Sequence, residues 1–240
     1  MEITFVGTGS MGSVERCNTS MLIDNILFDC GMGTTKQLNR LKIPISKIRY
    51  IVITHFHADH TFDIPNYLVQ RMATGDRDKR LTFIGPVGLR QRIVDMVTMA
   101  FADGDNEKYK DIEGINNIDF IEIGNEESVE FDFKLTAYKL LHQTCSEEQG
   151  YILEKEGKKL GILWDTTFCD NYEKVCQNVE YVFSDVTRID TTDAHIGINE
   201  FKEFYKKYPG VKFYAMHRAD YSTEGMDGIE FPVDGDKIII

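Results

Sequence analysis

The sequence predicts a layered α/β fold built around two β-sheets, with residues 1–240 forming one domain. Short apolar, β-branched segments occur in two batches along the chain. Each batch is accompanied by segments whose apolar residues have helical spacing. No repeat, low-complexity tract or Pro/Ser-rich linker divides the 240 residues, and this length suits one large domain or at most two small ones.

The first batch begins with two predicted strands, at residues 2–6 and 20–28, joined by a Gly/Ser/Asn-rich turn region. A helix is expected at 34–42, with Thr34 as a candidate N-cap and leucines on one face. The short apolar run RYIVI at 49–53 predicts a buried strand.

The first batch continues with a helix at 62–73 and a strand at 81–84 that ends before Gly85-Pro86. A further helix is expected from residue 87. Its apolar positions are spaced for one buried face: Ile93, Val94, Val97 and Phe101.

An acidic, turn-rich insert at 103–117 separates the two batches and leaves open a lid, a dimer contact or a plain loop. The second batch contains strands and helices in alternation. Strands are expected at 118–123, 129–140, 150–155, 159–164, 180–184, 211–216 and 236–240, and helices at 170–178 and 199–208.

Charge and composition limit the classes of function. The formal net charge of −12 works against nonspecific nucleic-acid binding, which depends on Lys and Arg neutralising phosphates. The densest basic cluster comprises Arg71, Arg77, Lys79 and Arg80, and is either a solvated loop or a contact for a substrate phosphate. No apolar run has the length of a membrane span, and the N-terminal residues lack the features of a signal peptide, so a cytoplasmic protein is expected. The five cysteines form no CxxC pair and are expected to be reduced thiols, although one could be a metal ligand.

The segment His55-Phe56-His57-Ala58-Asp59-His60 predicts a metal site. It directly follows the predicted strand at 49–53, and loops at strand ends are where functional residues gather. Two imidazoles spaced i, i+2 on extended backbone can turn toward one point, whereas on a helix they would diverge. Four candidate ligands in six residues exceed what one tetrahedral ion takes from so short a loop, which indicates two adjacent metals.

The remaining ligands must come from distant segments. His142, Asp165 and His217 each follow an apolar predicted strand. Taken singly, a histidine at a strand end is more often structural, and an aspartate before Thr-Thr is more often a helix cap. Together with the cluster at 55–60, they are expected to line one edge of the sheets as further metal ligands.

These motifs resemble those of the metallo-β-lactamase superfamily over nearly the whole chain. Asp29 in the segment Leu27–Gly31 is similar to an aspartate that braces the metal loop in that superfamily. Within it, the segments 81–89 (LTFIGPVGL), His142 with Gly150-Tyr151, and Asp165-Thr166 resemble the ribonuclease Z and phosphodiesterase branch. The resemblance implies a four-layer αβ/βα sandwich.

The resemblance also implies a division of metal ligands. His55, His57 and His142 would hold one ion, Asp59, His60 and His217 would hold the second, and Asp165 would bridge them. Two divalent ions are expected, zinc first, with manganese or iron as alternatives. A hydroxide bridging the ions would attack phosphorus in line, and Asp59 is counted among the catalytic residues as well as the ligands.

The sixth histidine, His195, precedes the predicted helix at 199–208. The ribonuclease Z branch has a histidine near this place that assists the leaving group. His195 is therefore either the general acid or a surface or capping residue.

The substrate is expected to be smaller than tRNA. Ribonuclease Z enzymes carry a long basic arm after the Gly-Tyr motif, whereas a short strand-like segment joins Tyr151 to Asp165 here. With the net charge of −12, this favours a dinuclear phosphodiesterase acting on a small phosphodiester, such as a cyclic nucleotide, and disfavours a tRNA partner. A homodimer is common in the resembling family.

Three alternatives remain open. The same scaffold supports ester, lactone or thioester hydrolysis, because fold does not determine substrate. A tRNA 3′-end endonuclease is the second. The third is a metal or ligand sensor without turnover, which the presence of both Asp59 and Asp165 disfavours.

Overall fold

The computed structural model of the chain describes residues 1–101, 117–143, 145–224 and 226–240. Within these ranges the strands form two seven-stranded mixed sheets. The strand order is β14-β1-β2-β3-β4-β5-β6 in the first sheet and β13-β12-β11-β10-β9-β8-β7 in the second. The predicted fold class is confirmed, with one sheet from each batch of strands except that two strands of the second batch, β6 and β14, join the first sheet.

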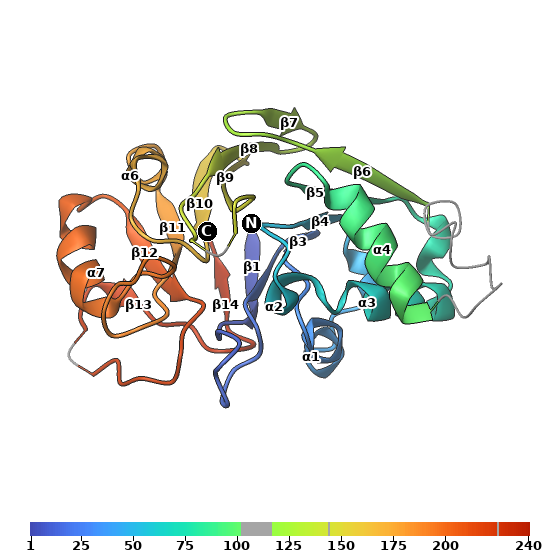
Figure 1. Cartoon of the computed structure of the whole chain (residues 1–240), viewed down its shortest axis with the longest axis horizontal. Coiled ribbons are helices and arrows are strands. Elements are labelled where there is room, and N and C mark those ends of the chain that lie inside the picture. The colour runs from blue at the N-terminus through green and yellow to red at the C-terminus, as the bar shows by residue number, and fades with distance from the viewer. Residues whose placement is uncertain (102–116, 144, 225) are drawn as a thin grey trace.

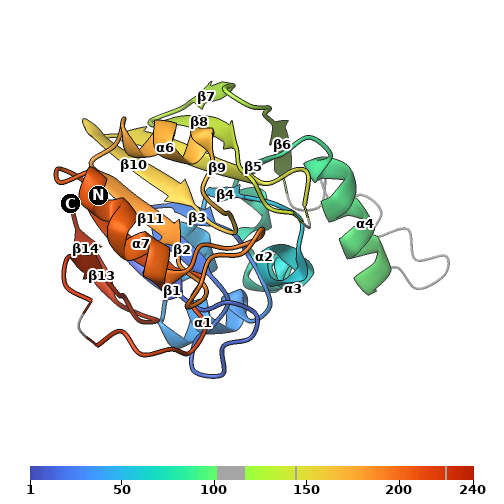
Figure 2. The ribbon, with the colours of Figure 1, turned by 60° about the vertical axis from the view of Figure 1, so that its left-hand side comes forward.

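The first sheet comprises β1 (Glu2–Gly7), β2 (Ser20–Ile23), β3 (Ile26–Phe28), β4 (Tyr50–Val52), β5 (Leu81–Gly85), β6 (Ile118–Glu122) and β14 (Lys237–Ile239). The second comprises β7 (Ser128–Glu130), β8 (Lys134–Lys139), β9 (Gln149–Lys155), β10 (Lys158–Leu163), β11 (Tyr181–Asp185), β12 (Lys212–Met216) and β13 (Ile229–Glu230). The two chain ends lie side by side, and the amino group of Met1 donates to the carbonyl of Ile240 at 3.1 Å (Figure 2).

Helices cover the outer faces of the two sheets. The described α-helices are α1 (Thr34–Arg40), α2 (Ala58–Thr61), α3 (Ile64–Thr74), α4 (Leu89–Phe101), α6 (Asp170–Cys176) and α7 (Ile198–Phe204), with 3₁₀ turns at Ile45–Lys47, Asp76–Asp78 and Tyr205–Lys207. In Figure 1, α3 and α4 lie on the right-hand side of the molecule and α6 and α7 on the left-hand side. The layers therefore run helix, sheet, sheet, helix, as the resemblance implies.

Three apolar clusters hold these layers together. The central cluster lies between the sheets, where Phe28 and Trp164 from opposite sheets meet edge to face at 6.3 Å between ring centroids. The second packs the outer face of the first sheet against α1, α3 and α4. The third packs the second sheet against α6 and α7. Both faces of each sheet are thus buried, which explains the continuous apolar runs in the sequence.

Two predicted strands are hairpins in the structure. The predicted strand at 20–28 divides into β2 and β3 with a two-residue turn, in which Asp24 has a φ of 52°. The predicted strand at 129–140 divides into β7 and β8. In the first hairpin the turn is the polar pair Asp24-Asn25, which interrupts an otherwise apolar segment.

Other helices and strands also differ from the predicted ones. The predicted helix at 62–73 corresponds to α3, which begins only at Ile64, and the separate short helix α2, which contains Asp59 and His60, had not been predicted. The Gly- and acid-rich tail contributes β13, which had not been predicted. The acidic insert at 103–117 lies, except for Asn117, outside the described residues, so its predicted roles stay untested.

A candidate metal centre at the strand ends

Loops that follow four strands carry the predicted ligands to one place. The loop after β4 carries His55 and His57, and His57 has extended backbone with φ −65° and ψ 157°. The residues after β8, β10 and β12 are His142, Asp165 and His217. Strands β10, β11 and β12 run parallel, so the residues that follow them meet at the same edge of their sheet.

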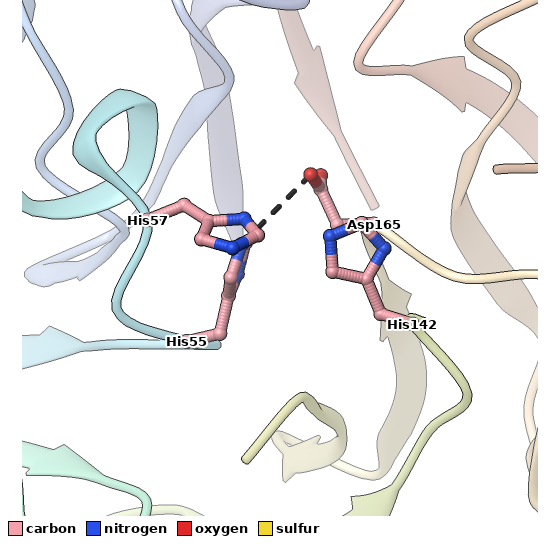
Figure 3. A group of neighbouring side chains, drawn as sticks. All are labelled: His55, His57, His142 and Asp165. Carbon is pink, nitrogen blue, oxygen red and sulfur yellow. Dashed lines mark ion pairs between the residues drawn. The ribbon is translucent and has the colours of Figure 1, made fainter. Parts of the chain in front are cut away.

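The structure brings all seven predicted ligands together in two groups that share Asp165. The ligand atoms within each group lie within 4.8 Å of one another. The groups are His55, His57, His142 and Asp165, and Asp59, His60, Asp165 and His217. In Figure 3 the imidazoles of His55 and His57 face His142 and Asp165 across a gap.

Asp165 lies between the histidines of both groups. Its Oδ1 is 3.2 Å from Nε2 of His60 and 3.2 Å from Nε2 of His217. Its Oδ2 is 3.9 Å from Nε2 of His55 (dashed line in Figure 3). The two carboxylate oxygens of one residue therefore point toward different halves of the cluster.

Three residues of the cluster have left-handed backbone conformations. The φ angle is 54° at Asp29, 46° at Asp165 and 53° at His217. Such angles are uncommon outside glycine and cost free energy, and they persist only where the surrounding structure imposes them. Here they turn the chain sharply at a strand end, which brings a side chain back over the sheet edge.

Buried polar atoms in the cluster have no hydrogen-bond partner among the described residues. They are Nε2 of His55, Nε2 of His60 and Oδ1 of Asp165. An orphaned buried polar atom is costly and calls for an explanation. Neutral imidazole nitrogens and carboxylate oxygens that converge without partners fit divalent cations, so the residues present suit two metal ions.

The outward-facing nitrogens of the histidines are held by other groups. Nδ1 of His60 donates to Oδ2 of Asp29 at 2.6 Å, and Nδ1 of His142 donates to the carbonyl of Ala194 at 2.9 Å. Nδ1 of His55 lies 2.8 Å from Oε2 of Glu148. Contacts of this kind set the tautomer, and thereby direct Nε2 toward the metal.

Asp29 braces the metal loop and belongs to neither ligand group. Its Oδ1 accepts from the backbone N–H of Thr54 at 2.8 Å, and its Oδ2 accepts from the Thr54 hydroxyl at 2.8 Å and from His60. The carboxylate therefore fixes both ends of the segment that carries the clustered histidines.

The electrostatics favour the metal-binding forms of Asp165 and His55, whereas His60 differs: burial lowers its pKa, but the charges of Asp165 and Asp29 outweigh burial and raise that pKa well above its ordinary value. Burial raises the pKa of Asp165, but the charges of His217 and His60 outweigh burial and hold that pKa well below its ordinary value. Burial together with the charge of His60 lowers the pKa of His55 well below its ordinary value. An ionised carboxylate and a neutral imidazole are the forms that bind a cation.

His195 lies beside the cluster and is held by Asp185, the last residue of β11. Its Nδ1 is 2.8 Å from Oδ2 of Asp185, which is completely buried. Burial lowers the pKa of His195, but the hydrogen bond and charge of Asp185 outweigh burial, so this pKa lies above its ordinary value. The imidazolium form of His195 is therefore favoured.

Thr187 joins this pair to the metal ligands. Its hydroxyl donates to Oδ1 of Asp185 at 2.5 Å, so its oxygen is left to accept from Nδ1 of His217 at 2.8 Å. Asp185 thus orients His195 directly and His217 through Thr187.

Three residues of the site were missed by the sequence reasoning: Asp185, Thr187 and Glu148. Asp185 also belongs to a third group, with Asp165, His195 and His217, whose ligand atoms lie within 4.8 Å of one another. Its place at the end of a buried strand was the available signal, as it was for Asp165. No feature of the sequence pointed to Glu148, because it is one of two adjacent glutamates in a polar stretch.

The structure decides two questions that the sequence left open: whether a cysteine is a metal ligand, and whether the basic cluster contacts the substrate. The five cysteines are free, and none belongs to the ligand groups formed by described residues. The basic cluster at 71–80 lies on α3 and the turn after it and is absent from the described lining of the cleft beside the metal site. Arg71 is completely buried and donates to the carbonyl of Lys79.

A cleft of about 910 Å³ opens onto the candidate metal centre. Its described lining includes ligands from both groups, His195 and the loop tip at 10–12. The volume falls in the usual range for small-molecule sites.

Comparison with known proteins agrees with this fold and site. The family profile described as "Anti-Pycsar protein Apyc1" matches residues 1–230. The chain is 27% identical over 246 residues to ribonuclease Z of Staphylococcus carnosus, which covers 79% of the chain and 77% of that relative.

Two solved structures share the fold. A diphosphatase of the PhnP family superposes with a TM-score of 0.74 at 20% identity, over 100% of this chain and 97% of that one. The short form of human tRNase Z superposes with a TM-score of 0.76 at 21% identity, over 100% and 99%. No described helix is both long and apolar enough to cross a membrane.

Proposed function

The chain belongs to the family of the anti-Pycsar protein Apyc1, in the metallo-β-lactamase superfamily and close to its ribonuclease Z branch, and from this premise we propose that it hydrolyses a small phosphodiester. It is a metal-dependent hydrolase. Within the proposal, the substrate is a cyclic nucleotide or a phosphodiester of similar size.

The observation that carries the proposal is the pair of four-residue groups that share Asp165 beneath a small cleft. In the proposed site, one ion is held by His55, His57 and His142 and the other by Asp59, His60 and His217. Asp165, which belongs to both groups, would be shared by the two ions. Zinc is the first choice for both, with manganese and iron as alternatives, since imidazole and carboxylate ligands accept all three.

When bound, such a pair of ions lowers the pKa of water toward neutrality and offsets the charge that develops on the phosphoryl oxygens. The side chains of the protein position the reacting groups and transfer protons. Asp185 holds the His195 ring, and the ring lines the cleft beside His217. His195 would donate a proton to the departing alkoxide oxygen as general acid.

The shape of the molecule supports a small substrate. The segment from Tyr151 to Asp165 contains a hairpin, in which a two-residue turn of Glu156 and Gly157 joins β9 to β10. Both turn residues have positive φ, at 52° and 76°, the conformation of tight hairpin turns. There is no arm at this place to grip tRNA, and the net charge of −12 gives little attraction for a long polyanion.

The proposal is tested by assaying bis-p-nitrophenyl phosphate and a panel of cyclic nucleotides beside a thioester and a lactone, after loading with zinc, manganese or iron. Phosphodiester turnover that depends on metal is expected. If only the thioester or lactone were cleaved, the ester hydrolase alternative would replace the phosphodiesterase proposal. Absence of any turnover in the loaded protein would favour a sensor.

A tRNA 3′-end endonuclease is the second candidate, because the matched curated relatives are ribonuclease Z proteins. A precursor tRNA in the same panel separates the two. Cleavage of this RNA at a rate far above that of cyclic nucleotides would reassign the substrate.

Replacing His195 by alanine is expected to slow cleavage of an alkyl phosphodiester by about 10²-fold or more, because general-acid assistance is worth that much with a poor leaving group. Bis-p-nitrophenyl phosphate, whose leaving group needs no proton, should be affected far less. Metal content per chain should stay unchanged. Equal losses on both substrates would show that His195 supports the structure of the site instead.

A further inference from the structure

The loop from β11 to α7 crosses the wall of the cleft and carries, besides His195, the arginine Arg188. Both the backbone N–H and the backbone carbonyl of Arg188 are hydrogen-bonded. The N–H of Arg188 donates to the carbonyl of Ile196 at 3.4 Å, and the N–H of Ile198 donates to the carbonyl of Arg188 at 2.8 Å. The backbone of Arg188 is therefore held in place. It follows Thr187 in the chain, and it pairs with the residues just after His195.

The rest of this loop is also well anchored. The hydroxyl of Thr191 and its backbone N–H donate to Oε2 of Glu200 at 2.9 and 3.0 Å. The carbonyl of Ala194 accepts from the metal-ligand candidate His142. These hydrogen bonds hold the loop beside the candidate metal centre, so a side chain on it can act as part of the site.

The charge pattern of the cleft makes Arg188 distinctive. Among the lining residues that the structure describes, it is the only arginine or lysine. Its side chain is exposed, and it forms no ion pair with a carboxylate in the described part of the chain. In a chain with 39 acidic and 27 basic residues, an arginine left without a carboxylate beside an active-site cleft keeps its full hydrogen-bonding capacity.

An arginine guanidinium offers paired N–H donors whose geometry matches two oxygens of a phosphoryl group. Three aspartates line the same cleft: Asp59 and Asp165 are assigned to the metals, and Asp193 forms no ion pair with Arg188 in the described part of the chain. The charge of Arg188 is thus available to a ligand that enters from solvent.

We propose that Arg188 binds a non-bridging oxygen of the substrate's phosphoryl group and thereby makes the site selective for anionic phosphoesters over neutral carboxylic esters. This rests on the proposed phosphodiesterase function and specifies the group that recognises the anion. Arg188 supplies a positive charge on the side of the phosphate that faces the loop. This charge is additional to that of the metal ions that the two ligand groups would hold.

The test compares Arg188→Ala and Arg188→Lys with Arg80→Ala, all loaded with metal. Arg80 is exposed, pairs with Asp119 and is not among the lining residues of the cleft, so its replacement removes the same charge elsewhere. Calorimetry measures the affinity for inorganic phosphate, metal analysis measures ions per chain, and kinetics with bis-p-nitrophenyl phosphate gives KM and kcat.

Phosphate affinity is expected to fall about tenfold or more in Arg188→Ala, since a hydrogen bond to a charged group is worth that much. KM should rise by a similar factor, and metal content should not change. Arg188→Lys should recover part of the loss, because lysine restores charge without the paired donors. Arg80→Ala should match the wild type.

Two outcomes would overturn the assignment: phosphate affinity in Arg188→Ala close to that of the wild type, or a wild type that binds no phosphate. Failure of the phosphodiesterase proposal gives a different result. In that case phosphate binding would depend on Arg188 while the wild type left every phosphodiester intact.

Discussion

Asp165→Ala is expected to lower phosphodiester turnover by about 10³-fold or more, because the charge stabilisation that a metal pair supplies is worth several kcal/mol. Asp165 belongs to all three groups of candidate ligands. Its two oxygens face different histidines, so no neighbouring side chain replaces it. Metal content should fall from two ions per chain toward one.

Kinetics with bis-p-nitrophenyl phosphate and elemental analysis of the purified variant test this expectation together. Asp78→Ala is a suitable control, because Asp78 is an exposed carboxylate in the turn after α3 and its replacement changes the net charge equally. That control should retain both ions and full activity. Full activity with two ions in Asp165→Ala would contradict the bridging role.

Gly31→Ala is expected to destabilise the fold by about 1–3 kcal/mol or more and to disrupt metal binding, because overpacking a filled site has costs of this size. A Cβ at residue 31 would stand 1.5 Å from the carbonyl oxygen of Asp59 and 3.0 Å from the backbone nitrogen of His60. The obstructing atoms are backbone, so no rotamer change relieves the clash. The segment with two candidate ligands must move.

The neighbouring hydrogen bonds make this movement costly. The N–H of Cys30 donates to the carbonyl of His60 at 2.8 Å, and the N–H of Asp63 donates to the carbonyl of Cys30 at 3.0 Å. Both bonds hold the two segments at their present distance. A shift of α2 therefore breaks backbone bonds as well as displacing Asp59.

Denaturant unfolding with and without metal, together with metal analysis, measures both effects. Gly210→Ala is the matched control, since a Cβ there meets nothing within 4 Å. It should be neutral or slightly stabilising, because alanine restricts the unfolded chain. Wild-type stability and two bound ions in Gly31→Ala would show that the backbone at this contact adapts freely.

The local pattern of residues 55–60 was enough to place a metal site, because His55 and His57 precede the helix α2 and can turn toward one point, while Asp59 and His60 within α2 supply the second group. The layered fold could also be predicted, since both faces of each sheet are covered and inner strands such as β2, β3 and β5 are buried throughout and correspondingly apolar. His142, Asp165 and His217 could be singled out by a shared position after apolar runs.

What the sequence by itself determined is therefore the chemistry of the site and the class of the fold. Only the tertiary structure decided which scattered residues complete the site. Glu148 and Arg188 each stand in ordinary surroundings along the chain, and Asp185 has only its place at a strand end as a signal, whereas the more conspicuous basic cluster at 71–80 lies away from the cleft. Proximity between distant segments depends on how two sheets pack and where strands end, and these are long-range contacts that local spacing does not encode.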